Sequence, residues 1–256
     1  MNRVNRMTRA LGLALLAGLL GCGAAKPDDR ELVAGYLRPD PYPRLVVELD
    51  AVEGLALADD VVGPLLLALD GLVDKPGGIE LVVDDSLPAS AGRDWTFAEL
   101  EQLAEQTFDL EVEPDTIKIH VLLLDGSYHE SDGDELLGLA WGHRHAALFQ
   151  LGIQAACSTG NGGKGLSSKS CRSAELGVLA HEIGHVIGLV NNGVPMVEDH
   201  EDPEHPHHTR DSDCLMYWAY ERRAVVTKIQ DAIDAGTAPE EALGFCPPSL
   251  ADLAAY

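Results

Sequence analysis

Basic residues are scarce in this 256-residue sequence. Lys and Arg together number 18, against 42 Asp and Glu, and the formal net charge at pH 7 is −24. A surface this acidic repels nucleic-acid phosphates and anionic lipid headgroups. It also leaves carboxylates free for Ca²⁺. We therefore expect no nucleic-acid partner, and we keep calcium as a candidate ligand of the acidic segments.

Motifs that would point to other classes of function are also missing. The sequence has no internal repeat and no Cys-x-x-Cys pair of the kind that builds cysteine zinc sites. The Gly-rich segment 160–165 is not followed by Lys-Ser/Thr, so it does not predict a phosphate-binding loop. The acidic segment 198–213 lacks the spacing of an EF-hand. A cysteine zinc site, a phosphate-binding loop and an EF-hand are therefore not expected.

The first residues have the pattern of an export signal. Arginines precede an apolar run at 11–20 that is too short to span a bilayer as a mature helix, which predicts a signal peptide over 1–21. Residues 19–22 resemble the bacterial lipobox, Leu-x-Gly-Cys, whose cysteine is lipidated. The resemblance implies that Cys22 is lipidated and that the chain is an exported lipoprotein of the cell envelope. Gly23 in place of Asp favours the outer membrane or cell surface, with membrane contact through the lipid anchor only.

Four further cysteines predict two disulfides, because an even number in an exported protein favours pairing. Four cysteines allow three pairings. We favour Cys157–Cys171, which would close the Gly-rich segment, together with Cys214–Cys246. The second would tie the segment that follows the candidate active site to the C-terminal tail.

The apolar pattern alternates between strands and helices. The sequence therefore predicts an α+β fold, with a mixed, mostly parallel sheet over an active-site helix. The predicted strands are 44–49, 79–83, 117–124 and a short pair at 136–141 and 146–151; the predicted helices are 55–72, 96–106, 173–190 and 221–235. Thr96 is the candidate N-cap of the second helix, with Glu99 at the capping-box distance, and Ser173 is the candidate N-cap of the third.

The composition also suggests how the chain is divided. Residues 22–42 are rich in Gly, Ala, Asp and Pro and are expected to form a flexible tether. Residues 43–256 are expected to form one domain. Its N-terminal lobe, 43–190, would carry the active-site helix, and a smaller helical C-terminal lobe would follow at 191–256.

The motif that carries chemistry is His181-Glu182-Ile183-Gly184-His185. Histidines four residues apart lie on the same face of a helix, so both imidazoles can reach one metal ion. Glu182 lies one step round the helix, where it can accept a proton but not ligate. His-Glu-x-x-His is the pattern of zinc peptidases, in which zinc lowers the pKa of its water to about 7 and the glutamate accepts the proton. The apolar residues of this helix fall opposite His181, which predicts that the histidines line a cleft.

The sequence resembles the metzincin clan of metallopeptidases. The resemblance rests on the motif at 181–185 with Gly188 three residues on, and on Cys214-Leu215-Met216-Tyr217-Trp218, which is similar to the Met-turn that places a methionine below the metal. More narrowly, residues 173–218 resemble a group of bacterial exported metalloproteases. The resemblance implies a metzincin-like fold, with Met216 in the Met-turn.

The third metal ligand departs from the pattern of the clan. Metzincins place it three residues after the glycine, and this chain has Asn191 there, whose amide oxygen is a poor zinc ligand. We expect His200 instead, because it closely follows the turn at 193–195 and stands among carboxylates that could orient its other nitrogen. His208 is the alternative. His205 and His207 are expected to be solvated or to contact the metal ligands without binding the metal.

The predicted function is that of a zinc-dependent metalloendopeptidase acting on proteins or peptides outside the cytoplasm. His181, His185 and His200 would bind Zn²⁺, and Glu182 would be the general base. The alternative is a non-catalytic lipoprotein with a degenerate metzincin fold that binds a metal or a partner. Hydrolysis of a non-peptide amide by the same zinc–glutamate pair is a third hypothesis.

Overall fold

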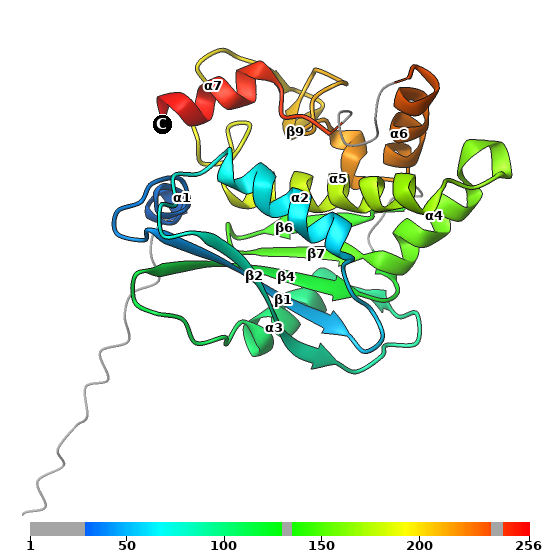
Figure 1. Cartoon of the computed structure of the whole chain (residues 1–256), viewed down its shortest axis with the longest axis horizontal. Helices are drawn as coiled ribbons and strands as arrows, with labels where there is room; N and C mark the ends of the chain where they lie inside the picture. The colour runs from blue at the N-terminus through cyan, green and yellow to red at the C-terminus, as the bar shows by residue number, and fades with distance from the viewer. Residues whose placement is uncertain (1–28, 130–134, 237–242) are drawn as a thin grey trace, which may run out of the picture.

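The computed structural model describes residues 29–129, 135–236 and 243–256, so the expected signal peptide and Cys22 lie outside the described residues. Its main sheet has five strands in the order β2-β1-β4-β7-β6 (Figure 1). Neighbouring strands from β2 to β7 are parallel, and the edge strand β6 is antiparallel to β7. The mixed, mostly parallel sheet is therefore confirmed. The strands are β1 (Arg44–Val52), β2 (Ile79–Leu87), β4 (Thr116–Leu124), β6 (Gly138–Trp141) and β7 (His145–Phe149).

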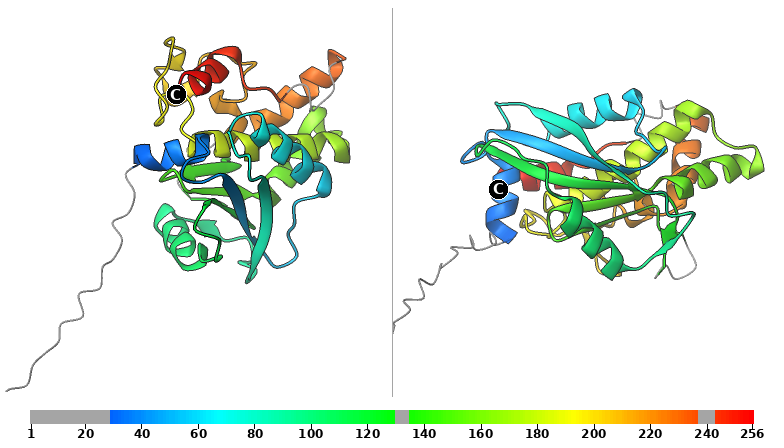
Figure 2. Two further views of the ribbon diagram at one scale, coloured as in Figure 1. Left: turned by 60° about the vertical axis from the view of Figure 1, so that its left-hand side comes forward. Right: turned by 90° about the horizontal axis from the view of Figure 1, so that it is seen from below.

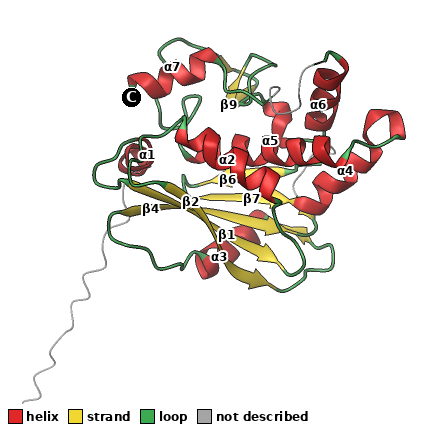
Figure 3. Ribbon diagram, in the orientation of Figure 1, coloured by secondary structure: helices red, strands yellow, loops and turns green. Residues whose placement is uncertain are grey.

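Helices cover both faces of this sheet. Helices α2 (Asp59–Asp70), α4 (Gln150–Gly163) and α5 (Ser168–Val186) lie on one face, and α3 (Phe97–Thr107) lies on the other (Figures 2 and 3). The alternation of side chains along each strand explains the two cores. In β4, Ile119 and Val121 pack into the larger core with α2 and α5, whereas Leu122 and Leu124 face α3.

Two local predictions are confirmed in detail. Thr96 caps α3 in a capping box, because its side chain accepts from the Glu99 backbone while the Glu99 side chain accepts from the Thr96 backbone. The short strand pair is the β6–β7 hairpin. Gly142 and His143 at its turn both have positive φ, as a type I′ turn requires.

The candidate active-site helix α5 begins and ends earlier than predicted. Ser167, not Ser173, is its N-cap, and Gly188 with φ of 93° follows its C-terminus. The helix is buried on every side from residue 173 to Val186, because it lies between the sheet and the C-terminal lobe. The prediction of a helix with one core-facing stripe is therefore wrong, and both faces of α5 are packed.

Residues 29–37, expected within a flexible tether, instead form helix α1 (Asp29–Leu37). Its buried side chains include Val33, which lies against the turn that contains Gly188 and Gly193. The Tyr36 hydroxyl lies 2.9 Å from the carbonyl oxygen of His143 in the β6–β7 turn. The expectation of a tether is thus corrected from residue 29 onward: apolar side chains at helical spacing bury α1 beside the site.

The C-terminal lobe stacks on the outer side of α5, away from the sheet (Figure 1). The predicted helix 221–235 corresponds to α6, which begins at Ala224 after the 3-10 turn η1, and a last helix α7 was not predicted. The elements of the C-terminal lobe are β8 (Glu201–Asp202), β9 (His205–Thr209), η1 (Trp218–Glu221), α6 (Ala224–Asp234) and α7 (Pro247–Ala255). Strands β3 (Asp94–Trp95) and β5 (Ser127–Tyr128) form a separate small pair beside α3.

The two favoured disulfides are both present. Cys157–Cys171 joins α4 to α5, and Cys214–Cys246 joins the segment after β9 to the start of α7. Among the described helices, none combines the length and the apolar character needed to cross a membrane.

Candidate metal centre

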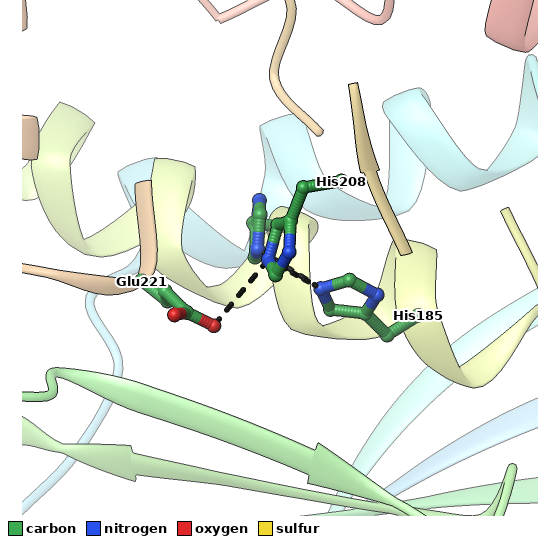
Figure 4. Close-up of side chains that lie close together, drawn as sticks. His185, His208 and Glu221 are labelled. Atoms are coloured by element: carbon green, nitrogen blue, oxygen red, sulfur yellow. Dashed lines mark hydrogen bonds and ion pairs between the residues drawn. The ribbon is translucent and has the colours of Figure 1, made fainter. Parts of the chain in front are cut away.

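Three imidazoles meet at the middle of the molecule. His181 and His185 project from α5, with their Nε2 atoms 3.1 Å apart, and His208 on β9 brings its Nε2 to 3.2 Å from that of His185 (Figure 4). Ligand atoms bound to zinc at about 2.0–2.1 Å in a tetrahedron lie about 3.3–3.4 Å from one another. Both distances from the His185 Nε2 are therefore close to what one zinc ion requires.

Backbone carbonyls orient two of these rings. The Nδ1 of His181 lies 2.7 Å from the carbonyl oxygen of Leu215, and the Nδ1 of His208 lies 3.0 Å from that of Pro206. A carbonyl oxygen can only accept, so each Nδ1 donates. The Nε2 lone pairs are then available at the cluster, in the arrangement typical of histidine ligands in proteins.

Burial also keeps the helix histidines neutral. Burial, together with the nearby His208, lowers the pKa of His181 to about 4. Burial likewise lowers the pKa of His185 well below its usual value, and the neighbouring imidazoles act in the same direction. A neutral imidazole is the form that binds a metal, so the site is set for coordination at neutral pH.

Glu182 is fully buried beside the cluster, and neither of its carboxylate oxygens has a hydrogen-bond partner among the described residues. Burial raises the pKa of this carboxyl well above its usual value, and the negative charge of Glu221 raises it further. An unpartnered buried carboxylate is costly in an ordinary core. Its presence here indicates a group kept for chemistry.

The segment that resembles the Met-turn forms a tight turn beside α5. The Tyr217 amide donates to the Cys214 carbonyl at 3.0 Å, which closes a tight turn with Met216 inside it. A Cβ added to Gly184 would lie 2.4 Å from the Met216 sulfur, so this fully buried methionine packs directly against the helix between the two histidines. The structure thus places Met216 under the histidine pair.

The structure brings His208, and not His200, to the cluster. His200 is buried elsewhere: its Nε2 lies 2.8 Å from the Asp252 carboxylate, and its Nδ1 lies 3.3 Å from the Thr209 hydroxyl. The expectation of His200 as third ligand is therefore corrected in favour of the alternative, His208. The β8–β9 hairpin accounts for the difference, because it turns the chain back towards α5 at residue 208.

The remaining candidates of the loop lie outside the cluster. The Asn191 amide donates to Glu201 at 3.1 Å, His205 stacks on Trp218 with ring centroids 4.5 Å apart, and His207 is exposed. The carboxylates of the loop form hydrogen bonds with His205, with the His207 amide and with Arg210. Among the described residues, the carboxylates that do come together are Glu48, Asp50 and Asp84 on the sheet. The calcium expectation for the loop thus gains no support.

Sequence reasoning missed Glu221, the fourth group of the cluster. Its Oε2 lies 3.5 Å from the His208 Nε2, and one donor atom each from His181, His185, His208 and Glu221 all lie within 4.8 Å of one another (Figure 4). Burial would raise the pKa of Glu221, but its contact with His208 and the charges nearby hold that pKa below its usual value. The sequence predicted only a helix start at this position, and no motif spacing marks it as a ligand.

The cluster opens to one side through a pocket of about 280 Å³. Glu182, His185, His208 and Glu221 line its inner part, and the edge strand β6 with the β6–β7 turn lines its wall. A small molecule or an extended chain can therefore reach the imidazoles and the buried carboxylate from the same side.

The donor set fits a divalent cation. Three imidazoles bring their Nε2 atoms together, and the unpartnered Glu182 carboxylate lies beside them. Imidazole nitrogen suits zinc, and a cation would compensate the buried carboxylates. These residues can hold zinc and keep a proton acceptor next to it.

Comparisons with known proteins find similar solved structures at low sequence identity. No family model and no curated protein matches the chain. Among solved structures, archaemetzincin from Methanopyrus kandleri is similar with a TM-score of 0.47 and 13% identity, over 83% of this chain and 95% of that one. Archaemetzincin from Archaeoglobus fulgidus, complexed with malonate, gives a TM-score of 0.42 and 16% identity, over 82% and 99%. The chemistry of this site comes from the side chains described above.

Proposed function

We propose that this protein is a zinc-dependent endopeptidase whose metal ligands are His181, His185 and His208. The observation that carries the proposal is the meeting of three Nε2 atoms, at 3.1 and 3.2 Å, next to a buried glutamate without a partner. A set of three histidines with a neighbouring carboxylate is the arrangement of hydrolytic zinc sites. The bound zinc would polarise the substrate carbonyl and lower the pKa of water.

Glu182 is the general base in this proposal. It accepts a proton from the attacking water and passes it to the leaving amine, as a positioned carboxylate can. Its place is set by packing, because the backbone of Gly138 lies directly against its side chain. The Leu215 and Pro206 carbonyls hold two of the imidazoles in the orientation that binding requires.

Strand β6 offers a surface for an extended peptide. It is the edge of the five-stranded sheet, and Leu139, Ala140 and Trp141 line the pocket in front of the cluster. A peptide that adds to this edge as a further strand would pass the imidazoles. Substrate recognition by strand addition would leave side-chain preference to the pocket walls, which include His143 and His207.

We also propose that the protein acts outside the cytoplasm, as a lipoprotein anchored through Cys22. The two disulfides support an oxidising compartment. The lipobox-like segment lies outside the described residues, so the anchor rests on the sequence pattern alone.

A single substitution tests the enzymatic proposal. Glu182→Gln keeps the shape of the side chain and removes the proton acceptor. We expect zinc to stay bound and casein or peptide cleavage to fall by at least about 100-fold, the lower range for a general base. Glu105→Gln, at an exposed position of α3, is the matched control and should cleave normally. Cleavage by the Glu182 variant at the wild-type rate would contradict the proposal.

The position of Glu221 supports a second candidate function, that of a protein that binds metal without catalysis. Structural zinc sites have four protein ligands, and Glu221 could supply the fourth here. A protein that only binds metal would then show full zinc occupancy and no cleavage by the wild type. The unpartnered Glu182 favours the enzyme, because a structural site needs no general base.

A further inference from the structure

Glu221 reaches the histidine cluster from η1, an element separate from α5 and β9. It is the last residue of η1, and its carboxylate lies 3.5 Å from the His208 Nε2 (Figure 4). Its side chain retains only 16% of its exposure. The Glu221 carboxylate lines the pocket that leads to the cluster.

The backbone of Glu221 is held firmly. Its carbonyl accepts from the Leu137 amide at 2.7 Å, and the next residue, Arg222, forms a bridge with Leu136. Both contacts fix this segment to the chain just before β6. Any movement of Glu221 is therefore confined to its side chain.

The Glu221 carboxylate lies between two partner side chains, His208 and Arg222, one at each oxygen. One oxygen, Oε2, faces the imidazoles, and the other, Oε1, lies 3.5 Å from the Arg222 Nε. A small rotation of the side chain would take the carboxylate from the cluster towards the guanidinium. Arg222 is partly buried, so a charge-assisted hydrogen bond there would be a stable second position.

We propose that Glu221 is a displaceable fourth ligand, which closes the metal centre in the resting protein and moves to Arg222 when a substrate enters. This rests on the proposed function. Three protein ligands leave a position open for substrate, whereas four close the site. The two glutamates then have different roles. Glu182 has no hydrogen-bond partner among the described residues and can accept the proton, and Glu221 occupies the coordination position that the substrate carbonyl needs.

Metal binding tests the proposal without reference to cleavage. Glu221→Gln and wild type are compared by chelator competition for zinc and, after loading with Co²⁺, by titration with acetohydroxamate followed in the visible spectrum. We expect the variant to bind zinc at least about tenfold more weakly, since even supporting groups of metal sites contribute that much. We expect acetohydroxamate to bind the variant at least tenfold more tightly, because the competing carboxylate is gone.

Arg222→Gln is a second variant with the opposite expectation. It removes the alternative partner of the carboxylate, so the closed form gains and acetohydroxamate should bind more weakly than to wild type. Glu204→Gln, an exposed carboxylate on the turn of the β8–β9 hairpin, is the control and should match wild type in both titrations.

The outcomes of these titrations separate a failure of the displaceable-ligand proposal from a failure of the proposed function. Unchanged acetohydroxamate affinity in Glu221→Gln, or tighter binding in Arg222→Gln, overturns the displaceable ligand. The proposed function fails differently, through a wild type that holds no zinc or a Glu182→Gln protein that still cleaves. A wild type that binds zinc and cleaves, with Glu221→Gln indistinguishable from it, would leave the peptidase intact and remove only this inference.

Discussion

Gly138 shows how a single residue without a side chain shapes the site. It is the first residue of β6 and lies against α5, where an added Cβ would be 2.4 Å from the Glu182 Oε1 and 2.6 Å from a Val178 methyl group. Its φ is not in the left-handed region, so close approach is the physical reason for glycine here. The strand backbone itself forms the wall that positions the proposed base.

We therefore predict that Gly138→Ala impairs catalysis while the metal stays bound. The new methyl group must push the Glu182 carboxylate out of place, and a shift of about 1 Å at a catalytic group can cost about 100-fold in rate. Peptide cleavage and zinc content measured on the same preparation check this. Gly244→Ala is the control, because its Cβ would meet open space. Normal cleavage by Gly138→Ala would show that the base is not confined by β6.

At the scale of elements, the hairpin that carries His208 depends on the C-terminal helix. Asp252 of α7 is 1% exposed, accepts from the Val197 amide at 2.6 Å and pairs with His200 at 2.8 Å. His200 in turn contacts Thr209, the neighbour of His208. The disulfide Cys214–Cys246 ties the same helix to the segment after the hairpin. Helix α7 thus positions a proposed ligand that it does not touch.

Removal of this support should weaken metal binding without abolishing it. We predict that Asp252→Ala lowers the free energy of unfolding by about 1–3 kcal/mol, the cost of leaving buried polar groups unpaired. The same variant should bind zinc about tenfold more weakly, as a loss of support for a ligand does. Leu250→Ala, at a partly exposed position of α7, provides the comparison. A folded Asp252 variant with wild-type zinc affinity would show that the hairpin holds His208 alone.

For the whole molecule, the sequence predicts local features well. The capping box at Thr96, the β6–β7 hairpin, the disulfide pairing and the pair of histidines on α5 all depend on residues close in sequence or on very few alternatives. The main strands are predicted because their apolar runs are long enough to recognise, whereas their order in the sheet was not predicted. These are the signals for which sequence spacing and geometry agree.

Features that depend on contacts between residues far apart in the chain could not be predicted from the sequence. His200 and His208 lie in one acidic loop with similar neighbours, and the choice between them depends on Asp252, 52 residues away from His200. Helix α1 is short and polar enough to resemble a tether, and it is stabilised by contacts with the turns beside the site. Tertiary packing decided both cases, and no local pattern reports it.

The central claim is that His181, His185 and His208 form the metal site of the whole protein. Zinc per chain after exhaustive dialysis, measured on wild type, His208→Ala and His200→Ala, tests it most directly. We predict one zinc per chain in wild type and in His200→Ala. The zinc affinity of His200→Ala should be lower than that of wild type, because the hairpin loses support. His208→Ala should lose its zinc. Zinc retained by His208→Ala and lost by His200→Ala would contradict the account and return the third ligand to His200.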